Sequence, residues 1–355
     1  MARTEDKPKG RVSQKALAAH LGLSPSTVSL VLNNAPLAAA IPEATRQRII
    51  KAAQELDYRP DLYARYLFTG RSDTVAVMVP EIGEGFSASI LAGIDEELVR
   101  RNYAYFLANH HGDSELIKEF PRRFPQRAVE GVILINTPVT EALRCPVVSV
   151  GSQPVVGEMA RILLDNRLGA RLALGHLAEL GHREIAVIRG HQWRPAAAER
   201  WEGTQAEAKE RGITLDKRLT VEMISDEKHY RPATPAEGYD AAKQLLSRGV
   251  PFTALVAFND ISALGAIRAL HEAGWRVPED ISVIGFDDLP AAAYTIPRLT
   301  TLRQPLHQMG ALAASELVRW IGGEKPQERD VVVKPELMLR ETTGPVGASA
   351  RKGRE

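Results

Sequence analysis

The chain is poor in cysteine and has no long apolar stretch, and each shortage excludes a class of protein. Cys145 is the single cysteine among 355 residues, so no disulfide can form within the chain, as is usual in a reducing compartment. We expect its thiol to behave as a small buried hydrophobic group rather than a reactive one. No apolar run reaches the roughly 18 residues that a membrane span needs, and no His and Cys cluster has metal-site spacing.

The N-terminal segment lacks the apolar core of a signal peptide. It reads MARTEDKPKGR, and we therefore expect a cytoplasmic, nucleoid-associated protein that is not exported. Residues 1–73 carry 11 Lys and Arg against 7 Asp and Glu, whereas the remaining chain has a net charge of −3. A basic N-terminal region on a weakly acidic body suggests an anionic partner for that region.

The first 58 residues predict three short helices around a small core. The first is expected over 13–20, the second opens with Ser24 as N-cap and Pro25 at the first helical position, and the third runs from 42 to about 56. Two helices of about eight residues joined by a turn at Gly22 are typical of a helix-turn-helix. The side chains expected to form the core are Ala16, Leu17, Leu21, Val28, Val31, Leu32, Ile49, Ala53 and Leu56.

The second of these helices contains no Lys and no Arg, although the second helix of a helix-turn-helix is the one that enters the major groove of DNA. Its segment, 22–34, reads GLSPSTVSLVLNN. Small hydroxyls and free backbone N–H groups at a helix N-terminus can bind phosphate instead, helped by the positive end of the helix dipole. Those hydroxyls belong to Ser24, Ser26, Thr27 and Ser29. Simple capping is the alternative role, above all for Ser24.

Residues 59–73 differ in composition and predict a linker. Pro60 breaks the preceding helix, and one short helix is predicted over 61–68, ended by Gly70. A helix of that length is not stable alone. We therefore expect it to fold only with help from another surface.

From residue 74 to about 345, apolar strands alternate with amphipathic helices, which is typical of doubly wound parallel sheets. The expected elements, in chain order, are strand 74–80, helix 86–101, strand 103–108, helix 114–124, strands 131–135 and 146–150, helix 167–180, strand 184–188, helix 199–211, strand 219–224, helix 236–248, strand 253–258, helix 260–273, strand 281–286, helix 305–321 and strand 330–333. They form two series and predict two lobes, one over about 74–164 and the other over about 165–300. Residues 300–304 would cross back, so that 304–335 complete the first lobe.

Ligands of such sheets bind beyond the carboxyl ends of the strands, here in the cleft between the lobes. Asn259-Asp260 and Asp287-Asp288 directly follow two buried strands, and Arg200 opens the helix after a third. Such Arg, Asn and Asp side chains suit sugar hydroxyls, because each hydroxyl both donates and accepts a hydrogen bond. For Asp260 and Asp288 we prefer helix capping or a network within the lobe.

Many ordered motifs between residues 11 and 343 resemble the lac-repressor (LacI/GalR) family. They are Gly22–Asn33, Thr45-Arg46, Leu56–Pro60, Ala64–Leu67, Asp165-Asn166 with Gly169, Leu180–Ile185, Arg200–Gly203, Phe258–Asp260 with Gly265, Ile281–Asp288, Leu299–Thr301, and Pro335–Leu337 with Arg340. The resemblance implies a transcription regulator with a DNA-binding head at 1–58, a linker with a hinge helix at 59–73 and a periplasmic-binding-protein-like sensor at 74–345. From its charged composition we expect a disordered tail at 346–355.

The resemblance also implies a set of DNA contacts. It consists of Ser24, Pro25, Ser26, Thr27, Ser29, Leu30, Asn33, Tyr58, Arg65 and Leu67. Leu30 departs from the family pattern, in which Arg is common, and it can contact a thymine methyl group but cannot donate to guanine. Leu67 matches the family's minor-groove wedge, which works only if the hinge helices of a dimer lie side by side. Packing inside the protein is the alternative role for both leucines.

By the same resemblance the effector-binding set is Phe86, Asp165, Trp193, Arg200, Asn259 and Asp287. Phe86 and Trp193 would cover the apolar faces of a sugar ring, although a loop tryptophan often only packs. We predict a repressor of carbohydrate-utilisation genes that is controlled by a sugar and binds a pseudo-palindromic operator. It would act as a homodimer, with a tetramer as the alternative, and without a cofactor, metal ion or membrane partner.

Two other classes of function stay open at this point. One is a cytosolic solute-binding sensor whose ligand is a purine or a phosphorylated sugar; the predicted head and linker argue against a sensor without DNA binding, and no extra Lys and Arg cluster marks a phosphate pocket. The other is an enzyme. The cleft offers carboxylates but no recognisable nucleophile–base pair, no phosphate-binding glycine loop and no metal cluster, so we expect no enzymatic activity.

Overall fold

The computed structural model describes residues 12–33, 35–58, 70–83, 85–191, 194–223 and 234–347. The chain divides into two compact units, Met1–Ser72 and Asp73–Glu355. The hinge helix predicted over 61–68, with Arg65 and Leu67, lies outside the described residues, as do Trp193 and nearly all of the predicted tail.

Three α-helices build the first unit: α1 (Gln14–Leu21), α2 (Pro25–Leu32) and α3 (Glu43–Glu55). The N–H of Ala16 donates to the Ser13 hydroxyl and caps α1, and Gly22 ends α1 with φ of 67°, a left-handed conformation that suits glycine. A short 3₁₀ helix, η1 (Pro36–Ala40), precedes α3, and the sequence did not predict it.

The core of the first unit follows the expected pattern with one correction. The buried side chains are Leu17, Ala18, Val28, Val31, Ile49, Ala52 and Ala53, with Leu21, Leu32 and Leu56 packed against them. Ala16 was expected in this core but is exposed. The buried face of α1 passes through residues 17, 18 and 21, so the neighbouring position 16 points to solvent.

The first lobe of the second unit is a parallel sheet with strand order β11-β5-β4-β3-β1-β2. Its strands are β1 (Thr74–Val79), β2 (Ala104–Asn109), β3 (Val132–Ile135), β4 (Val147–Val150), β5 (Ala160–Leu164) and β11 (Asp330–Val333), and its helices are α5 (Gly85–Arg100), α6 (Ser114–Arg123), α11 (Leu306–Ile321) and the short η2 (Pro125–Arg127). Strand β5 was not predicted. Its apolar run is interrupted by Arg161, which pairs with Asp330 on the neighbouring strand β11.

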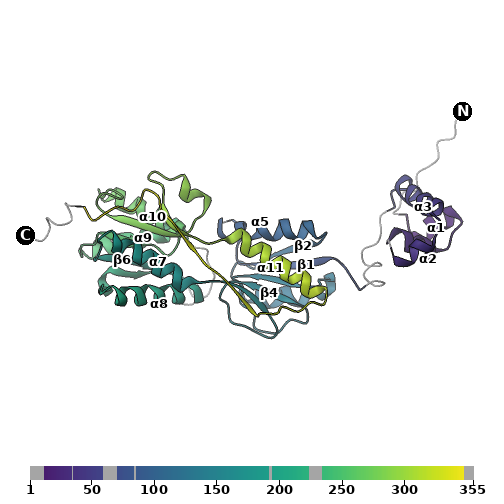
Figure 1. Ribbon diagram of the computed structural model, residues 1–355, viewed down its shortest axis with the longest axis horizontal. Helices are drawn as coiled ribbons and strands as arrows, with labels where there is room; N and C mark the ends of the chain where they lie inside the picture. The colour runs from purple at the N-terminus through teal and green to yellow at the C-terminus, as the bar shows by residue number, and fades with distance from the viewer. Residues whose placement is uncertain are drawn as a thin grey trace, which may run out of the picture. The chain divides into compact units, whose positions relative to one another are not determined.

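The second lobe is a sheet with strand order β12-β10-β9-β8-β6-β7. Its strands are β6 (Ile185–Arg189), β7 (Thr220–Glu222), β8 (Ala254–Val256), β9 (Ser282–Asp287), β10 (Thr300–Arg303) and β12 (Glu336–Met338), and its helices are α7 (Asn166–Glu179), α8 (Pro195–Glu210), α9 (Pro235–Ser247), α10 (Asp260–Glu272) and the short η3 (Lys217–Leu219) and η4 (Pro290–Ala293). Figure 1 shows the helices α7 to α10 around β6, and α5 and α11 beside β1, β2 and β4.

Three expectations for the second lobe need correction. Residues 300–304 do not simply cross between lobes, because most of them form β10, which pairs with β9. The sheet is not wholly parallel, since β12 runs antiparallel to β10. Helix α8 begins at Pro195 rather than at 199, with proline at the first helical position.

The chain passes between the two lobes after β5, after β10 and after β11, and Figure 1 shows the C-terminal yellow segment running from one lobe to the other. Beyond β12 the chain stays with the second lobe: Thr342 exchanges hydrogen bonds with Val283, and the N–H of Val346 donates to the carbonyl of Leu180. Within the described residues, no helix has the length and apolar character that crossing a membrane requires.

Helices α5 and α11 cross closely because each has glycine at the crossing. A Cβ atom added to Gly93 would lie 1.9 Å from the carbonyl oxygen of His307, and one added to Gly310 would lie 2.0 Å from that of Ile90. These neighbours are backbone atoms of packed helices, so they can yield only if the helices move apart.

We predict that Gly93→Ala lowers the melting temperature by several degrees, because overpacking a core costs about 1–3 kcal/mol. Thermal unfolding followed by circular dichroism would measure the change. Gly83→Ala is the matched control, since no atom lies within 4 Å of a Cβ built there. Equal melting temperatures for the two variants would contradict the close crossing.

Candidate functional site

The N-terminus of α2 gathers the hydroxyl groups that the sequence assigned to DNA. The N–H of Thr27 donates to the Ser24 hydroxyl at 3.1 Å, and the hydroxyls of these two residues lie 2.8 Å apart. The Ser26 hydroxyl is 3.3 Å from that of Ser24. Ser24, Pro25 and Ser26 are exposed. Ser24 therefore caps the helix, as its alternative role required, and it also stands beside further hydroxyls on an open surface.

The exposed side of α2 continues through Leu30 to the helix end. Leu30 is partly exposed and does not belong to the core cluster of this unit. The amide of Asn33 donates to the Ser29 hydroxyl at 3.1 Å. Tyr58, in contrast, packs against the core cluster. The structure thus places the hydroxyls, Leu30 and Asn33 along α2 and its two caps, whereas Tyr58 packs against the core.

Three basic side chains of α3 make contacts within this unit. Arg46 pairs with Glu43, Lys51 lies 3.8 Å from Glu55, and Arg48 donates to the carbonyl of Leu21 at the end of α1. Exposed ion pairs are weak, so a phosphate can share these charges.

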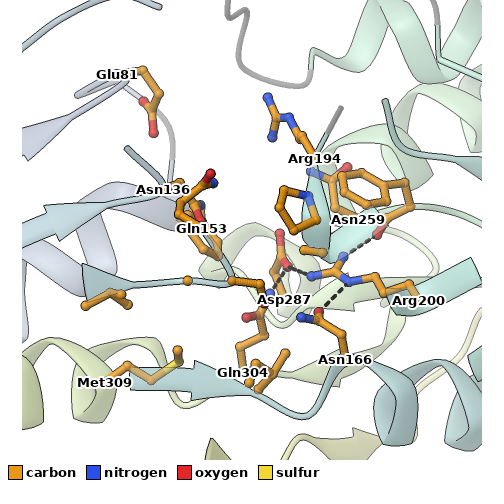
Figure 2. A pocket seen from close by; sticks show the side chains of 18 residues that line it. Glu81, Asn136, Gln153, Asn166, Arg194, Arg200, Asn259, Asp287, Gln304 and Met309 are labelled. Atoms are coloured by element: carbon orange, nitrogen blue, oxygen red, sulfur yellow. Dashed lines mark hydrogen bonds and ion pairs between the residues drawn. The ribbon is translucent and has the colours of Figure 1, made fainter. Parts of the chain in front are cut away.

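A cavity of about 920 Å³, its open mouth included, lies between the two lobes. Its lining residues are Glu81, Phe86, Asn136, Val150, Gly151, Ser152, Gln153, Leu164, Asn166, Arg194, Pro195, Ala196, Arg200, Phe258, Asn259, Asp287, Gln304 and Met309. In Figure 2, Glu81, Asn136 and Gln153 face Arg194 and Asn259 across the cavity, with Asp287 and Arg200 at its floor. Four predicted effector residues, Phe86, Arg200, Asn259 and Asp287, therefore meet in one place.

Arg200 is held on the cavity floor from several directions. Its Nε donates to Asn166 Oδ1 at 3.0 Å, its Nη1 donates to the carbonyl of Phe258 at 2.7 Å, and its Nη2 lies 3.8 Å from Asp287 Oδ1. The guanidinium lies 3.5 Å from the ring centre of Phe286 and 4.8 Å from that of Phe258. Burial lowers the pKa of Arg200 to about 10, so the side chain remains positive at neutral pH.

Asp287 ends β9 in an unusual backbone conformation, with φ of 125°. Such a conformation is costly for a residue with a side chain and is often found at functional sites. The amide of Gln304 donates to Asp287 Oδ1 at 2.5 Å. Burial raises the pKa of Asp287 to about 7, although the nearby Arg200 opposes this shift. A buried carboxyl group whose pKa lies near neutrality exchanges protons in the physiological range.

Asn259 and Asp165 both cap helices, but only Asn259 lines the cavity. The Oδ1 of Asn259 accepts from the N–H of Ser262 at 2.9 Å, so the amide NH₂ is the group that it offers to a ligand. Asp165 accepts from the N–H of Leu168 at 2.9 Å, and its neighbour Asn166 lines the cavity in its place.

Asp260 and Asp288 form internal networks, as we preferred from the sequence. Asp260 accepts from the N–H of Leu289 and from the Thr301 hydroxyl. Asp288 accepts from Arg303 and Arg340. These bonds connect α10, the end of β9, β10 and the C-terminal segment within the second lobe.

Sequence reasoning missed several lining residues of the first lobe. Asn136 follows β3, whereas Ser152 and Gln153 follow β4, all at carboxyl ends of parallel strands. The rule that located Asn259 and Asp287 would also have found these side chains. Unlike Asn259 and Asp287, these side chains have no acidic neighbour next to them in the sequence.

Neither a metal site nor a reactive thiol appears among the residues that the structure describes. No group of three His, Cys, Asp or Glu side chains there is placed to hold a metal ion. Cys145 is partly buried, and burial raises its pKa to about 11, so its thiol stays protonated at neutral pH.

Two protein-family models match the chain. Residues 15–61 match the model of bacterial regulatory proteins of the lacI family, and residues 174–343 match that of a periplasmic binding protein-like domain. The HTH-type transcriptional repressor PurR of Vibrio vulnificus (strain CMCP6) is 31% identical over 336 residues, which cover 92% of this chain and 97% of that protein.

Solved structures show the same fold. The complex of the transcriptional regulator CelR with cellobiose has 30% sequence identity and a TM-score of 0.68, covering 94% of this chain and 100% of that chain. The lac repressor dimer bound to operator and the anti-inducer ONPF has a TM-score of 0.81 with 24% identity, again over 94% of this chain and 100% of that chain.

The raised pKa of Asp287 leads to a prediction about pH and stability. A carboxyl group whose pKa is higher in the folded state binds more protons there than in the unfolded state, so stability falls as pH rises towards the folded value. Between pH 5 and pH 8, Asp287 changes from mainly neutral to mainly charged.

We predict that the melting temperature of Asp287→Asn, measured relative to the unmodified protein, rises by a few degrees from pH 5 to pH 8. Melting curves at pH 5, 6, 7 and 8 would measure the difference. Asp280→Asn is the control. Arg276 lowers the pKa of Asp280 to about 2, so Asp280 stays charged from pH 5 to pH 8. The difference in melting temperature between Asp280→Asn and the unmodified protein should therefore not change with pH. A constant difference for Asp287→Asn as well would rule out its titration near pH 7.

Proposed function

The chain belongs to the lacI family of bacterial regulatory proteins and is a DNA-binding transcriptional repressor with a ligand-binding domain, and on this premise we propose that a carbohydrate bound in the cavity controls the affinity of the protein for DNA. The observation that carries this proposal is the fixed Arg200 at the floor of a cavity lined by polar side chains from both lobes.

Sugar hydroxyls match this lining. Arg200 supplies donors, Asp287 supplies acceptors, the amides of Asn136 and Gln153 supply both, and the amide NH₂ of Asn259 supplies donors. Phe86 lies on the first-lobe side and offers an aromatic face to a sugar ring. The solved structure of the similar regulator CelR is that of its complex with cellobiose. By analogy, this supports a sugar as the effector of this chain. The regulated genes would then be those of carbohydrate utilisation.

A purine is the second candidate effector. The curated relative at 31% identity bears the name PurR. Amide side chains such as Asn136 and Gln153 can also pair with the edges of a nucleobase, and Phe86 or Phe258 can stack on it. The two candidates share a site but call for different ligands, so binding measurements separate them.

We predict that a sugar raises the melting temperature, since a ligand bound only by the folded state adds about 2.7 kcal/mol at 100 times its Kd. A thermal-shift screen would compare cellobiose, glucose and ribose with hypoxanthine and guanine. Arg200→Met should abolish the shift, whereas Arg268→Met, at an exposed position of α10, should keep it. If only hypoxanthine raised the melting temperature, the effector would be a purine and not a sugar.

For the DNA-binding unit, we propose that α2 contacts phosphates through its hydroxyls and reads bases through Leu30 and Ser26. Exposed hydroxyls at the N-terminus of α2 and the position of Leu30 outside the core support this proposal. Leu67, which lies outside the described residues, keeps the role of minor-groove wedge. Two copies of the chain would bind one operator, and the strongly exposed Tyr294 and Ile296 of the second lobe offer apolar surface for such an association.

We predict that Leu30→Arg shifts operator preference towards guanine at one position in each half-site, because arginine donates to guanine O6 and N7. Selection from a randomised duplex pool with the full chain would measure this preference. Leu37→Arg, a change at an exposed leucine of η1, is the control. Identical selected sequences for Leu30→Arg and the original protein would show that Leu30 does not face the bases. A selected sequence without two related half-sites would contradict binding of the operator by a dimer.

A further inference from the structure

A direct hydrogen bond joins the two lobes beside the cavity. The hydroxyl of Ser152 donates to Glu199 Oε2 at 2.9 Å. Ser152 follows β4 in the first lobe, whereas Glu199 lies in α8 of the second lobe. Both side chains are partly buried, so water competes less for this bond than it would at an open surface.

The same carboxyl oxygen also orients Asn166. The Nδ2 of Asn166 donates to Glu199 Oε2 at 2.7 Å, which leaves Oδ1 of the same amide to accept from Arg200 Nε at 3.0 Å. An asparagine amide has one donating and one accepting end. If Glu199 did not fix the donating end, the amide could turn and present its NH₂ group to the guanidinium, where two donors would meet.

The bonds therefore run in sequence from Ser152 through Glu199 and Asn166 to Arg200. Asn166 begins α7 directly after the crossing from β5, and Arg200 continues the series to Asp287 on the cavity floor. Glu199, Asn166 and Arg200 all lie in the second lobe, so their mutual bonds persist when the lobes separate. The bond from Ser152 is the member of this series that exists only while the lobes are together.

We propose that Glu199 is a positioning residue with two roles: its bond from Ser152 favours closure of the lobes, and its bond from Asn166 fixes the orientation of Arg200. The Ser152–Glu199 bond favours the closed arrangement before any ligand binds, because it is a contact that the open arrangement lacks. The consequence for effector binding rests on the proposed function, in which Arg200 contacts the ligand. The link between the lobes does not depend on the identity of that ligand.

Distance measurements between spin labels in the ligand-free full chain test the link. Cys145→Ala removes the native thiol, and Gln126→Cys and Gln244→Cys place one label on an exposed residue of each lobe. Mixing labelled protein with an excess of unlabelled chain restricts the signal to pairs within one chain. Ser152→Ala, Glu199→Ala, Glu199→Gln and the double alanine variant are compared in this background.

We expect Ser152→Ala to lower the ratio of closed to open molecules roughly tenfold, the change expected for loss of one hydrogen bond to a charged group. Glu199→Ala should have a similar effect, and the double variant should add little, because both changes break the same bond. Glu199→Gln should lose clearly less of the closed form than Glu199→Ala, since a glutamine oxygen can accept both bonds, although more weakly than a carboxylate. Ser315→Ala, which removes a bond to Arg101 within the first lobe, should leave the distances unchanged.

Arginine side-chain NMR tests the orientation of Arg200 separately. In ¹⁵N-arginine-labelled full chain, the Nε–H signal of Arg200, assigned through its loss in Arg200→Lys, should exchange with water roughly tenfold faster in Glu199→Ala than in Glu199→Gln. Distances in Ser152→Ala like those in Ser315→Ala would overturn the link, as would additive effects of Ser152→Ala and Glu199→Ala. Unchanged exchange in Glu199→Ala would overturn the positioning role. Neither readout contains a ligand, so each can fail while a sugar still raises the melting temperature.

Discussion

The pairing of Arg200 with Asp287 at the floor of the cavity is the constraint on which the ligand site depends. Both groups are buried, and a buried charge is tolerated only when it is paired and hydrogen-bonded. The structure meets this demand with Asn166, the Phe258 carbonyl and the ring of Phe286 around the guanidinium. Three elements of the second lobe, α7, α8 and β9, must therefore keep their relative positions. A ligand bound at this floor would meet side chains already held in place, which lowers the entropy lost on binding.

Most of the fold could be predicted because parallel strands buried on both faces appear as continuous apolar runs. Two strands that the sequence did not predict share one cause, because distant pairing partners decide whether these strands form. Arg161 interrupts the pattern of β5, and its partner Asp330 lies 169 positions away. Strand β12 has only three residues and exists because it pairs with β10. For the cavity, the carboxyl ends of β8 and β9 could be found from the sequence, but the link from Ser152 to Glu199 could not, since no local pattern places two lobes in contact.

The DNA contacts proposed for α2 would let a helix without cations bind a polyanion. The nearby arginines of α3 are engaged with Glu43 and with the end of α1, so they stabilise the unit as well as raising the local potential. Hydroxyls at the start of α2 need no charge of their own, because free N–H groups and the helix dipole provide the attraction. Affinity would then come from the whole unit, whereas sequence preference would come from a few side chains such as Leu30. This separation is usual, since phosphate contacts position a protein and base contacts specify the site.

Control of DNA binding by the cavity requires that a ligand distinguish two arrangements of the lobes. A ligand that touched only the second lobe would bind both arrangements equally and shift nothing. The lining offers contacts from both lobes, because Phe86, Asn136 and Gln153 come from the first lobe and Asn259 and Asp287 from the second. A ligand large enough to reach both sets gains contacts only on closure, and this difference is the free energy available for regulation. Part of that closure is already favoured by the bond from Ser152 to Glu199, so the effector need supply only the remainder. By reciprocity, DNA binding must change effector affinity by the same factor.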